Sequence, residues 1–131
     1  WTAEDYAEFE KRCEKTVYFY DRQEGSPGVP MNGRQTLSEN VSDQGAVQCI
    51  TEIVSRLENP DYKKLYRSMA KSWASTKTRE FAKYAAGIDV HSEDKLRVNR
   101  VVVNCDEFYE AFGITEKDGM WVDPAERVKI W

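Results

Sequence analysis

Apolar residues recur three and four positions apart along most of this 131-residue chain, and that periodicity constrains the fold more than any other feature. It predicts helices over about residues 2–20, 36–57 and 60–87, the last of them with a bend, and a short helix over 106–112. The only stretch rich in β-branched residues, 96–103, is predicted to form a short extended segment. We therefore expect a mainly α protein with enough chain to enclose one core.

Charge and cysteine content narrow the class of protein. The formal net charge is -4, whereas a nucleic-acid-binding module usually carries a basic face. No apolar run approaches the roughly 18 residues that a membrane span needs. The three cysteines, Cys13, Cys49 and Cys105, are odd in number and far apart, which argues against a disulfide framework. Cys49 is expected to be a small buried hydrophobe, because free cysteine is often buried.

The helix predicted over 36–57 contains an anomaly. At 100° per residue, Glu39 and Asp43 extend the apolar stripe that should face the core. Burying two carboxylates one turn apart costs on the order of several kcal/mol, unless a cation or good hydrogen bonds replace the water that they lose. Either the first turn projects into solvent, or a metal ion or an arginine faces the pair. The remaining stripe residues are Ala46, Ile50, Ile53, Val54 and Leu57, and the polar side holds Gln44, Gln48, Glu52 and Ser55.

The residues around this pair resemble a known family. Segment 32–45 contains Asn-Gly, a Thr-Leu pair, Glu-Asn-x-x-Asp and Gly, and is similar to the segment that supplies the third zinc ligand in neprilysin, endothelin-converting enzyme and PepO-type peptidases. Four further likenesses follow in order along the chain. They are the helix bearing Trp73, the substrate-binding stretch of the family (81–97 here, with Asp89, His91-Ser92 and Arg97-Val98-Asn99), the segment 108–113, and the ending 126–131. The resemblance thus covers nearly the whole chain.

The resemblance implies a role for four residues. Glu39 matches the glutamate that binds zinc, and Asp43 matches the aspartate that orients a zinc-bound histidine. His91 matches the histidine that stabilises the oxyanion during catalysis. Arg97 matches the arginine that hydrogen-bonds the backbone carbonyls of the substrate. Without the resemblance, His91 would be an ordinary surface residue of a loop, and Arg97 a solvated charge or a partner for a neighbouring acid, Asp94 or Glu93.

The family's H-E-x-x-H helix, which supplies two zinc ligands and the general base, is not in these residues. The chain also starts at Trp1 without a methionine, and 1–5 resembles the sequence that follows that helix. We therefore expect 1–131 to be a C-terminal fragment of a catalytic domain, namely the helical part of a thermolysin-like zinc metallopeptidase. The upstream part of the same polypeptide is the implied partner. Alone, the fragment is expected to be inactive, to bind zinc poorly and to self-associate through an exposed apolar face.

Smaller departures leave the four residues untouched. Glu93 stands where the family often has proline, and Val128 stands where membrane-anchored animal members have a cysteine. The latter favours a bacterial member, whose compartment, extracytoplasmic or cytoplasmic, stays open.

The implied function is that of a zinc-dependent endopeptidase, with one zinc ion in the full-length enzyme, that hydrolyses short peptides. The alternative is a non-catalytic helical interaction module or a degenerate peptidase homologue.

Overall fold

The computed structural model describes residues 1–130 and is helical, with no β-strand among those residues, so the mainly α prediction is confirmed. Trp131, the last residue of the family-like ending, lies outside the described part. No helix within 1–130 is both long enough and apolar enough to cross a bilayer. The helices are α1 (Ala3–Asp21), α2 (Leu37–Ser55), α3 (Tyr62–Ser72), α4 (Arg79–Ile88), α5 (Asp94–Val102) and α6 (Asp106–Phe112).

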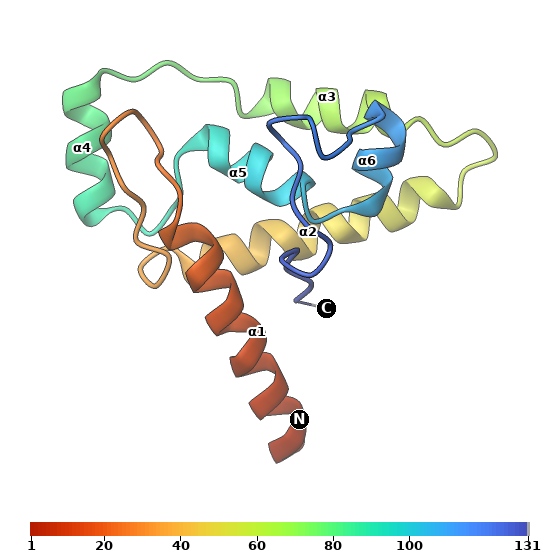
Figure 1. Ribbon diagram of the computed structural model, residues 1–131, viewed down its shortest axis with the longest axis horizontal. Helices are drawn as coiled ribbons and strands as arrows, with labels where there is room; N and C mark the ends of the chain where they lie inside the picture. Colours follow the sequence, from red (N-terminus) through yellow and green to blue (C-terminus); the bar gives the residue numbers. More distant parts are fainter. Residues whose placement is uncertain (131) are drawn as a thin grey trace.

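The body of the molecule is built around α5, which packs against both α2 and α3 (Figure 1). Helix α6 packs on α3, and α1 packs on α2 and projects away from the body. The chain after α6 returns over α2, where Val128 is buried. Val101, Val102 and Val103, each at most 2% exposed, form the centre of the core. Helices α2 and α5, which carry the candidate site, are thus held by the same core.

The start of α2 is fixed against the end of α1 by a close backbone approach at Gly33. A Cβ at this position would lie 2.3 Å from the carbonyl oxygen of Val17, so no other residue fits without a shift of the backbone. The Gly33 N–H donates to Asp21 Oδ1 at 2.6 Å, and Asn32 Oδ1 accepts from the Gln35 N–H at 3.0 Å. This turn orients the helix that bears the two carboxylates.

The extended segment predicted over 96–103 is wrong, because the structure has helix α5 there. Leu96, Val98, Val101 and Val102 are all buried between α2 and α3. A helix that is buried on several sides shows no clean apolar stripe, so its period could not be read from the sequence. Tertiary packing overrides the modest preference of valine for strands.

The single bent helix predicted over 60–87 is two helices. Asp61 caps α3 by accepting a hydrogen bond from the Lys64 N–H at 2.9 Å. Helix α3 ends at Ser72, and Thr78 then caps α4 by accepting from the Phe81 N–H at 3.2 Å. Because a cap of this kind satisfies backbone donors that a continuous helix would pair internally, residues 74–78 leave the helical conformation.

The apolar stripe of α2 does not face the core, contrary to the prediction. Ile50, Ile53 and Leu57 are 45%, 61% and 56% exposed, and Cys49, expected to be buried, is also exposed. The opposite face turns inward because its polar groups find partners: the Gln44 amide donates to the Val128 carbonyl, for example. The buried residues of α2 are Asn40, Val41, Gln44, Val47 and Thr51.

Candidate functional site

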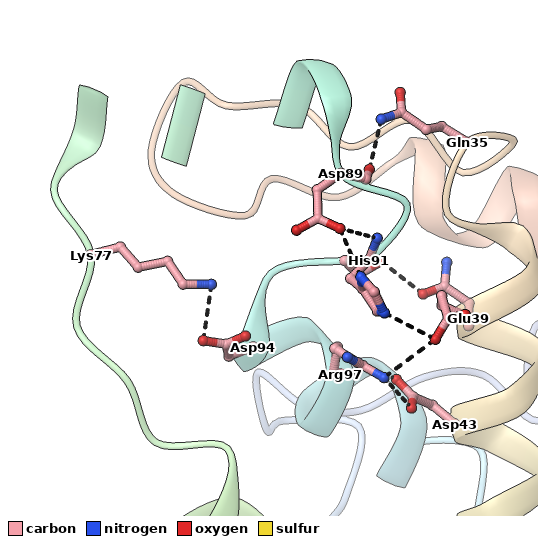
Figure 2. A network of polar contacts seen from close by, with 10 residues as sticks. Gln35, Glu39, Asp43, Lys77, Asp89, His91, Asp94 and Arg97 are labelled. Carbon is pink, nitrogen blue, oxygen red and sulfur yellow. Dashed lines mark hydrogen bonds and ion pairs between the residues drawn. The ribbon is translucent and has the colours of Figure 1, made fainter. Parts of the chain in front are cut away.

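Three elements converge on one cluster of charged side chains (Figure 2). Glu39 and Asp43 project from successive turns of α2, Arg97 projects from α5, and His91 lies in the loop that joins α4 to α5. Because α2 packs directly on α5, residues more than 50 positions apart in the chain come into contact. The structure therefore brings together all four residues that the resemblance singled out.

Arg97 holds Asp43 through two parallel hydrogen bonds. Its Nε donates to Asp43 Oδ2 at 2.6 Å and its Nη2 to Asp43 Oδ1 at 2.7 Å, while Nη2 also lies 3.8 Å from Glu39 Oε2. The ring of Trp73 covers the guanidinium, 4.1 Å from Cζ to the ring centroid. The Asp43 hydrogen bonds raise the pKa of Arg97 further above its ordinary value. This guanidinium is a fixed cation facing the two carboxylates.

His91 lies between two carboxylates. Its Nε2 is 3.2 Å from Glu39 Oε2, and its Nδ1 is 2.7 Å from Asp89 Oδ1. The backbone N–H of His91 also donates to Asp89 Oδ1 at 2.9 Å. Hydrogen bonds from this N–H and from the imidazole ring lower the pKa of the Asp89 carboxyl. Asp89 therefore fixes the imidazole so that Nε2 is the nitrogen directed at Glu39.

These contacts identify one of the partners that the sequence left open for the two carboxylates. An arginine faces Glu39 and Asp43, which explains why two acids share one turn of the helix. Arg97 does not pair with the acids next to it in sequence. Asp94 instead forms an ion pair with Lys77 at 2.9 Å, and Glu93 accepts from the Ser26 N–H at 2.7 Å.

Sequence reasoning assigned no role to three residues that support the site. Asp89 was quoted only as part of a family-like stretch, although Asp-x-His is a spacing that lets a carboxylate reach both the imidazole and its backbone N–H. Trp73, which marked only a family-like helix, packs against the core while also stacking on Arg97. Asn40 belongs to the family-like Glu-Asn-x-x-Asp pattern, but nothing in the sequence indicates that its side chain is buried.

The cluster can supply one ligand to a metal ion, but not a complete coordination sphere. The Glu39 side chain is 31% exposed, so its carboxylate is accessible from outside the chain. Within residues 1–130, no three His, Cys, Asp or Glu side chains converge in a way that could hold a metal. A structural or catalytic zinc site needs three or four protein ligands. The residues present therefore fit, at most, one part of such a site.

Comparison with known proteins gives consistent matches over the full chain. The family model described as peptidase family M13 matches residues 1–128. A neutral endopeptidase from Lactobacillus helveticus is 37% identical over all 131 residues, and human neprilysin is 25% identical over 146 aligned positions. These alignments cover 100% of this chain but 20% and 19% of the two relatives.

Solved structures match the fold closely. The crystal structure of PEPO from Lactobacillus rhamnosis HN001 has a TM-score of 0.89 at 33% identity, and covers 100% of this chain and 21% of that chain. Mycobacterium tuberculosis zinc metalloprotease ZMP1 in complex with an inhibitor has a TM-score of 0.88 at 28% identity, with 100% and 22% coverage. The chain thus spans about a fifth of the length of the proteins that it matches.

Proposed function

The chain belongs to peptidase family M13, and from that membership we propose that it forms the C-terminal part of the catalytic site of a zinc-dependent endopeptidase that cleaves short peptides. The observation that carries the proposal is the convergence of Glu39, Asp43, His91 and Arg97 from separate elements. A surface ion pair of no function would not need an imidazole, a guanidinium and two carboxylates from three parts of the chain.

Glu39 is proposed to be one zinc ligand, with the others coming from two histidines of an H-E-x-x-H helix elsewhere in the full polypeptide. Zinc held in this way would activate water and polarise the scissile carbonyl. The partial exposure of the Glu39 carboxylate supports this role, because its oxygens remain open to a group outside the chain.

His91 is proposed to donate from Nε2 to the oxyanion that forms on the scissile carbonyl, in the form that carries a proton on both ring nitrogens. The support is geometric: Asp89 holds Nδ1 at 2.7 Å and leaves Nε2 directed toward the side of the cluster where Glu39 lies. A donor that is already oriented needs no reorganisation when charge develops on the substrate.

Arg97 is proposed to donate to a backbone carbonyl of the bound peptide, and Asp43 to position it. Asp43 engages Nε and Nη2, and the opposite edge of the guanidinium carries donors that this contact does not use. A carboxylate accepts about four hydrogen bonds, so Asp43 has capacity to orient a zinc-bound histidine as well. In this arrangement Asp43 couples the metal side of the site to the substrate side.

The exposed apolar stripe of α2 supports a role for this chain as part of a larger enzyme. Ile50, Ile53 and Leu57 continue the line of Glu39 and Asp43 along the same helix face. A surface that carries both the zinc ligand and the stripe is suited to contact the polypeptide that would complete the site. A shallow pocket of about 380 Å³ between α2 and α3, which includes Ile50, Trp73 and Asp43, lies on this surface.

The proposal is tested by assaying the full-length protein with an internally quenched peptide of about ten residues. We expect cleavage that a chelator abolishes and added zinc restores. His91→Ala should lower kcat with a smaller effect on KM, because oxyanion stabilisation acts in the transition state. Lys95→Ala, an exposed substitution on α5, is the control and should leave both constants unchanged.

A full-length protein that cleaves no peptide in the presence of zinc would contradict the proposal. In that case the non-catalytic interaction module would account better for the exposed stripe. His91→Ala would then leave the binding of the module to its partner unchanged.

A further inference from the structure

We propose that Asn40 and Ser92 are positioning residues that hold His91 in register with Glu39. Each is the immediate chain neighbour of one site residue, and the two are joined by a buried hydrogen bond. This inference rests on the proposed function, in which the Glu39–His91 spacing matters for catalysis.

The bond belongs to a buried chain of three polar side chains. The Ser92 hydroxyl donates to Asn40 Oδ1 at 2.7 Å, and Asn40 Nδ2 donates to Thr36 Oγ1 at 2.9 Å. The Thr36 hydroxyl in turn donates to the Asn32 carbonyl at 3.0 Å. Ser92, Asn40 and Thr36 are only 2%, 1% and 2% exposed. A buried polar network is retained when every member finds a partner, and this one does.

This network sets the position of the His91 loop relative to the face of α2 that bears Glu39. Glu39 and Asn40 are consecutive on α2, so they point in directions about 100° apart, one toward the charged cluster and one into the protein. His91 and Ser92 show the same division, since His91 is exposed and Ser92 is buried. The Asn40–Ser92 contact therefore lies directly behind the 3.2 Å contact between Glu39 and His91. A slip of the loop along α2 would break both contacts.

The same loop has two further anchors that limit its motion. The Gln35 side-chain amide donates to the Asp89 carbonyl at 2.6 Å (Figure 2). On the other side of His91, the Glu93 carboxylate accepts from the Ser26 N–H at 2.7 Å and from the Ser26 hydroxyl at 3.0 Å. Both anchors lie nearer the surface than the Ser92 hydroxyl. Of the three, only the Asn40–Ser92 bond joins the loop to the helix that bears Glu39.

The test is a double-mutant cycle in the full-length enzyme. Ser92→Ala should lower kcat about tenfold, because a small misplacement of a catalytic group is costly, and should leave KM within about twofold. In a His91→Ala background, Ser92→Ala should lower kcat no further than about twofold, since Ser92 acts through His91. Ser42→Ala is the matched control: it deletes an exposed hydroxyl that donates within α2, to the Ser38 carbonyl.

A drop in kcat for Ser92→Ala that persists at full size without His91 would overturn the proposal, because it would mark a purely structural role. So would an unchanged kcat for Ser92→Ala when His91→Ala itself is impaired. If Ser92→Ala does not fold, Thr36→Val is run through the same cycle, with a smaller effect of the same sign expected.

A crystal structure of Ser92→Ala provides a readout that does not need activity. His91 should leave its 3.2 Å contact with Glu39, and an unmoved imidazole would contradict the inference. Failure of His91→Ala to affect activity, with the imidazole displaced in Ser92→Ala, would instead count against the proposed function alone.

Discussion

The two faces of α2 show opposite relations between polarity and burial. The inward face buries Asn40, Gln44 and Thr51, each with a hydrogen-bond partner from another segment or from the preceding turn. The outward face leaves Ile53 and Leu57 more than half exposed and places Glu39 beside them. An amphipathic helix in a self-contained domain would have the reverse arrangement.

In α2, polar side chains are buried beside Val41 and Val47 because hydrogen-bond partners are available to them. A buried amide or hydroxyl costs little when its hydrogen bonds are made, and it fixes the position of the helix more narrowly than apolar contact does. An exposed apolar stripe, in contrast, indicates a surface meant for contact. The inward face of α2 therefore sets the geometry of this chain, and the outward face is the one available to the rest of an enzyme.

The largest loss of activity is expected for substitutions at the charged end of the outward face. Asp43→Asn in the full-length protein should lower kcat/KM by up to about 100-fold, because Arg97 loses the charge that positions it. The side chains of Asp43 and Arg97 are only 15% and 12% exposed, so water does not replace the lost contact fully. Steady-state kinetics with a quenched peptide measures the effect.

The matched control for this substitution is Glu52→Gln, which also converts a carboxylate to an amide on α2. Glu52 pairs with Arg56 at the helix surface, so kcat/KM should stay within about twofold. Equal effects at Asp43 and Glu52 would remove the distinction between the two positions.

A polar-to-apolar change on the inward face should destabilise the protein, although the sequence pattern alone suggests the opposite. Gln44→Leu leaves the buried carbonyl of Val128 without its donor, at a cost of about 1–3 kcal/mol. The thermal unfolding midpoint of the full-length protein should fall accordingly. Gln48 is an exposed glutamine one turn later on the same helix, and Gln48→Leu should change the free energy of unfolding by less than about 0.5 kcal/mol. A neutral Gln44→Leu would mean that the inward face is not specified by its hydrogen bonds.

An apolar-to-polar change on the outward stripe should show its effect in association. The isolated 131-residue chain is expected to self-associate, and Ile53→Ser should weaken that association about tenfold, or roughly 1.4 kcal/mol. Sedimentation velocity over a concentration series measures it. Ile88→Ser, which changes an equally exposed isoleucine on α4, should have a smaller effect. A wild-type chain that stays monomeric would contradict the role assigned to the stripe.

The smallest effect on stability is expected at the ion pairs that hold the C-terminal segment in place. Hydrogen bonds from Lys129 and from Arg127 lower the pKa of Asp106. A lowered pKa stabilises the fold above the unfolded-state value of 3.8, and this contribution is lost as the pH falls through the lower folded-state value. Asp106→Asn should therefore reduce the acid sensitivity of the unfolding midpoint below about pH 5. Because Asp106 is 57% exposed, the difference should be no more than about 0.5 kcal/mol.

The matched control is Glu110→Gln on the exposed side of the same helix, α6, which should leave the acid dependence unchanged. An Asp106→Asn variant with the full wild-type loss of stability in acid would show that these ion pairs do not hold the segment.

Sequence reasoning could predict the elements whose signals are local. The capping pair Thr2 and Asp5 opens α1 at the predicted start, and Gly113, in the left-handed conformation, closes α6 at the predicted end. The resemblance also selected the four residues that meet at the cluster. Their individual roles stay predictions, because geometry alone does not assign chemistry.

The rest depended on contacts between distant segments. The helix at Asp94–Val102 is imposed by burial between α2 and α3, which outweighs the strand preference of its valines. The inward face of α2 is selected by partners such as Val128 and Ser92, which lie 84 and 52 positions away in sequence. Apolar periodicity indicates the helix but carries no information about these partners. The prediction therefore placed the wrong face of α2 against the core.

The most direct test of the account is the zinc content of the full-length protein beside that of its Glu39→Ala variant, with Glu52→Ala as the control. We predict about one zinc per wild-type chain and per Glu52→Ala chain, because a catalytic site holds a single ion through three protein ligands. Glu39→Ala should lose most of the metal and, with it, peptidase activity. A Glu39→Ala protein that retains its zinc and cleaves peptide at the wild-type rate would contradict the claim that the outward face of α2 is part of the metal site.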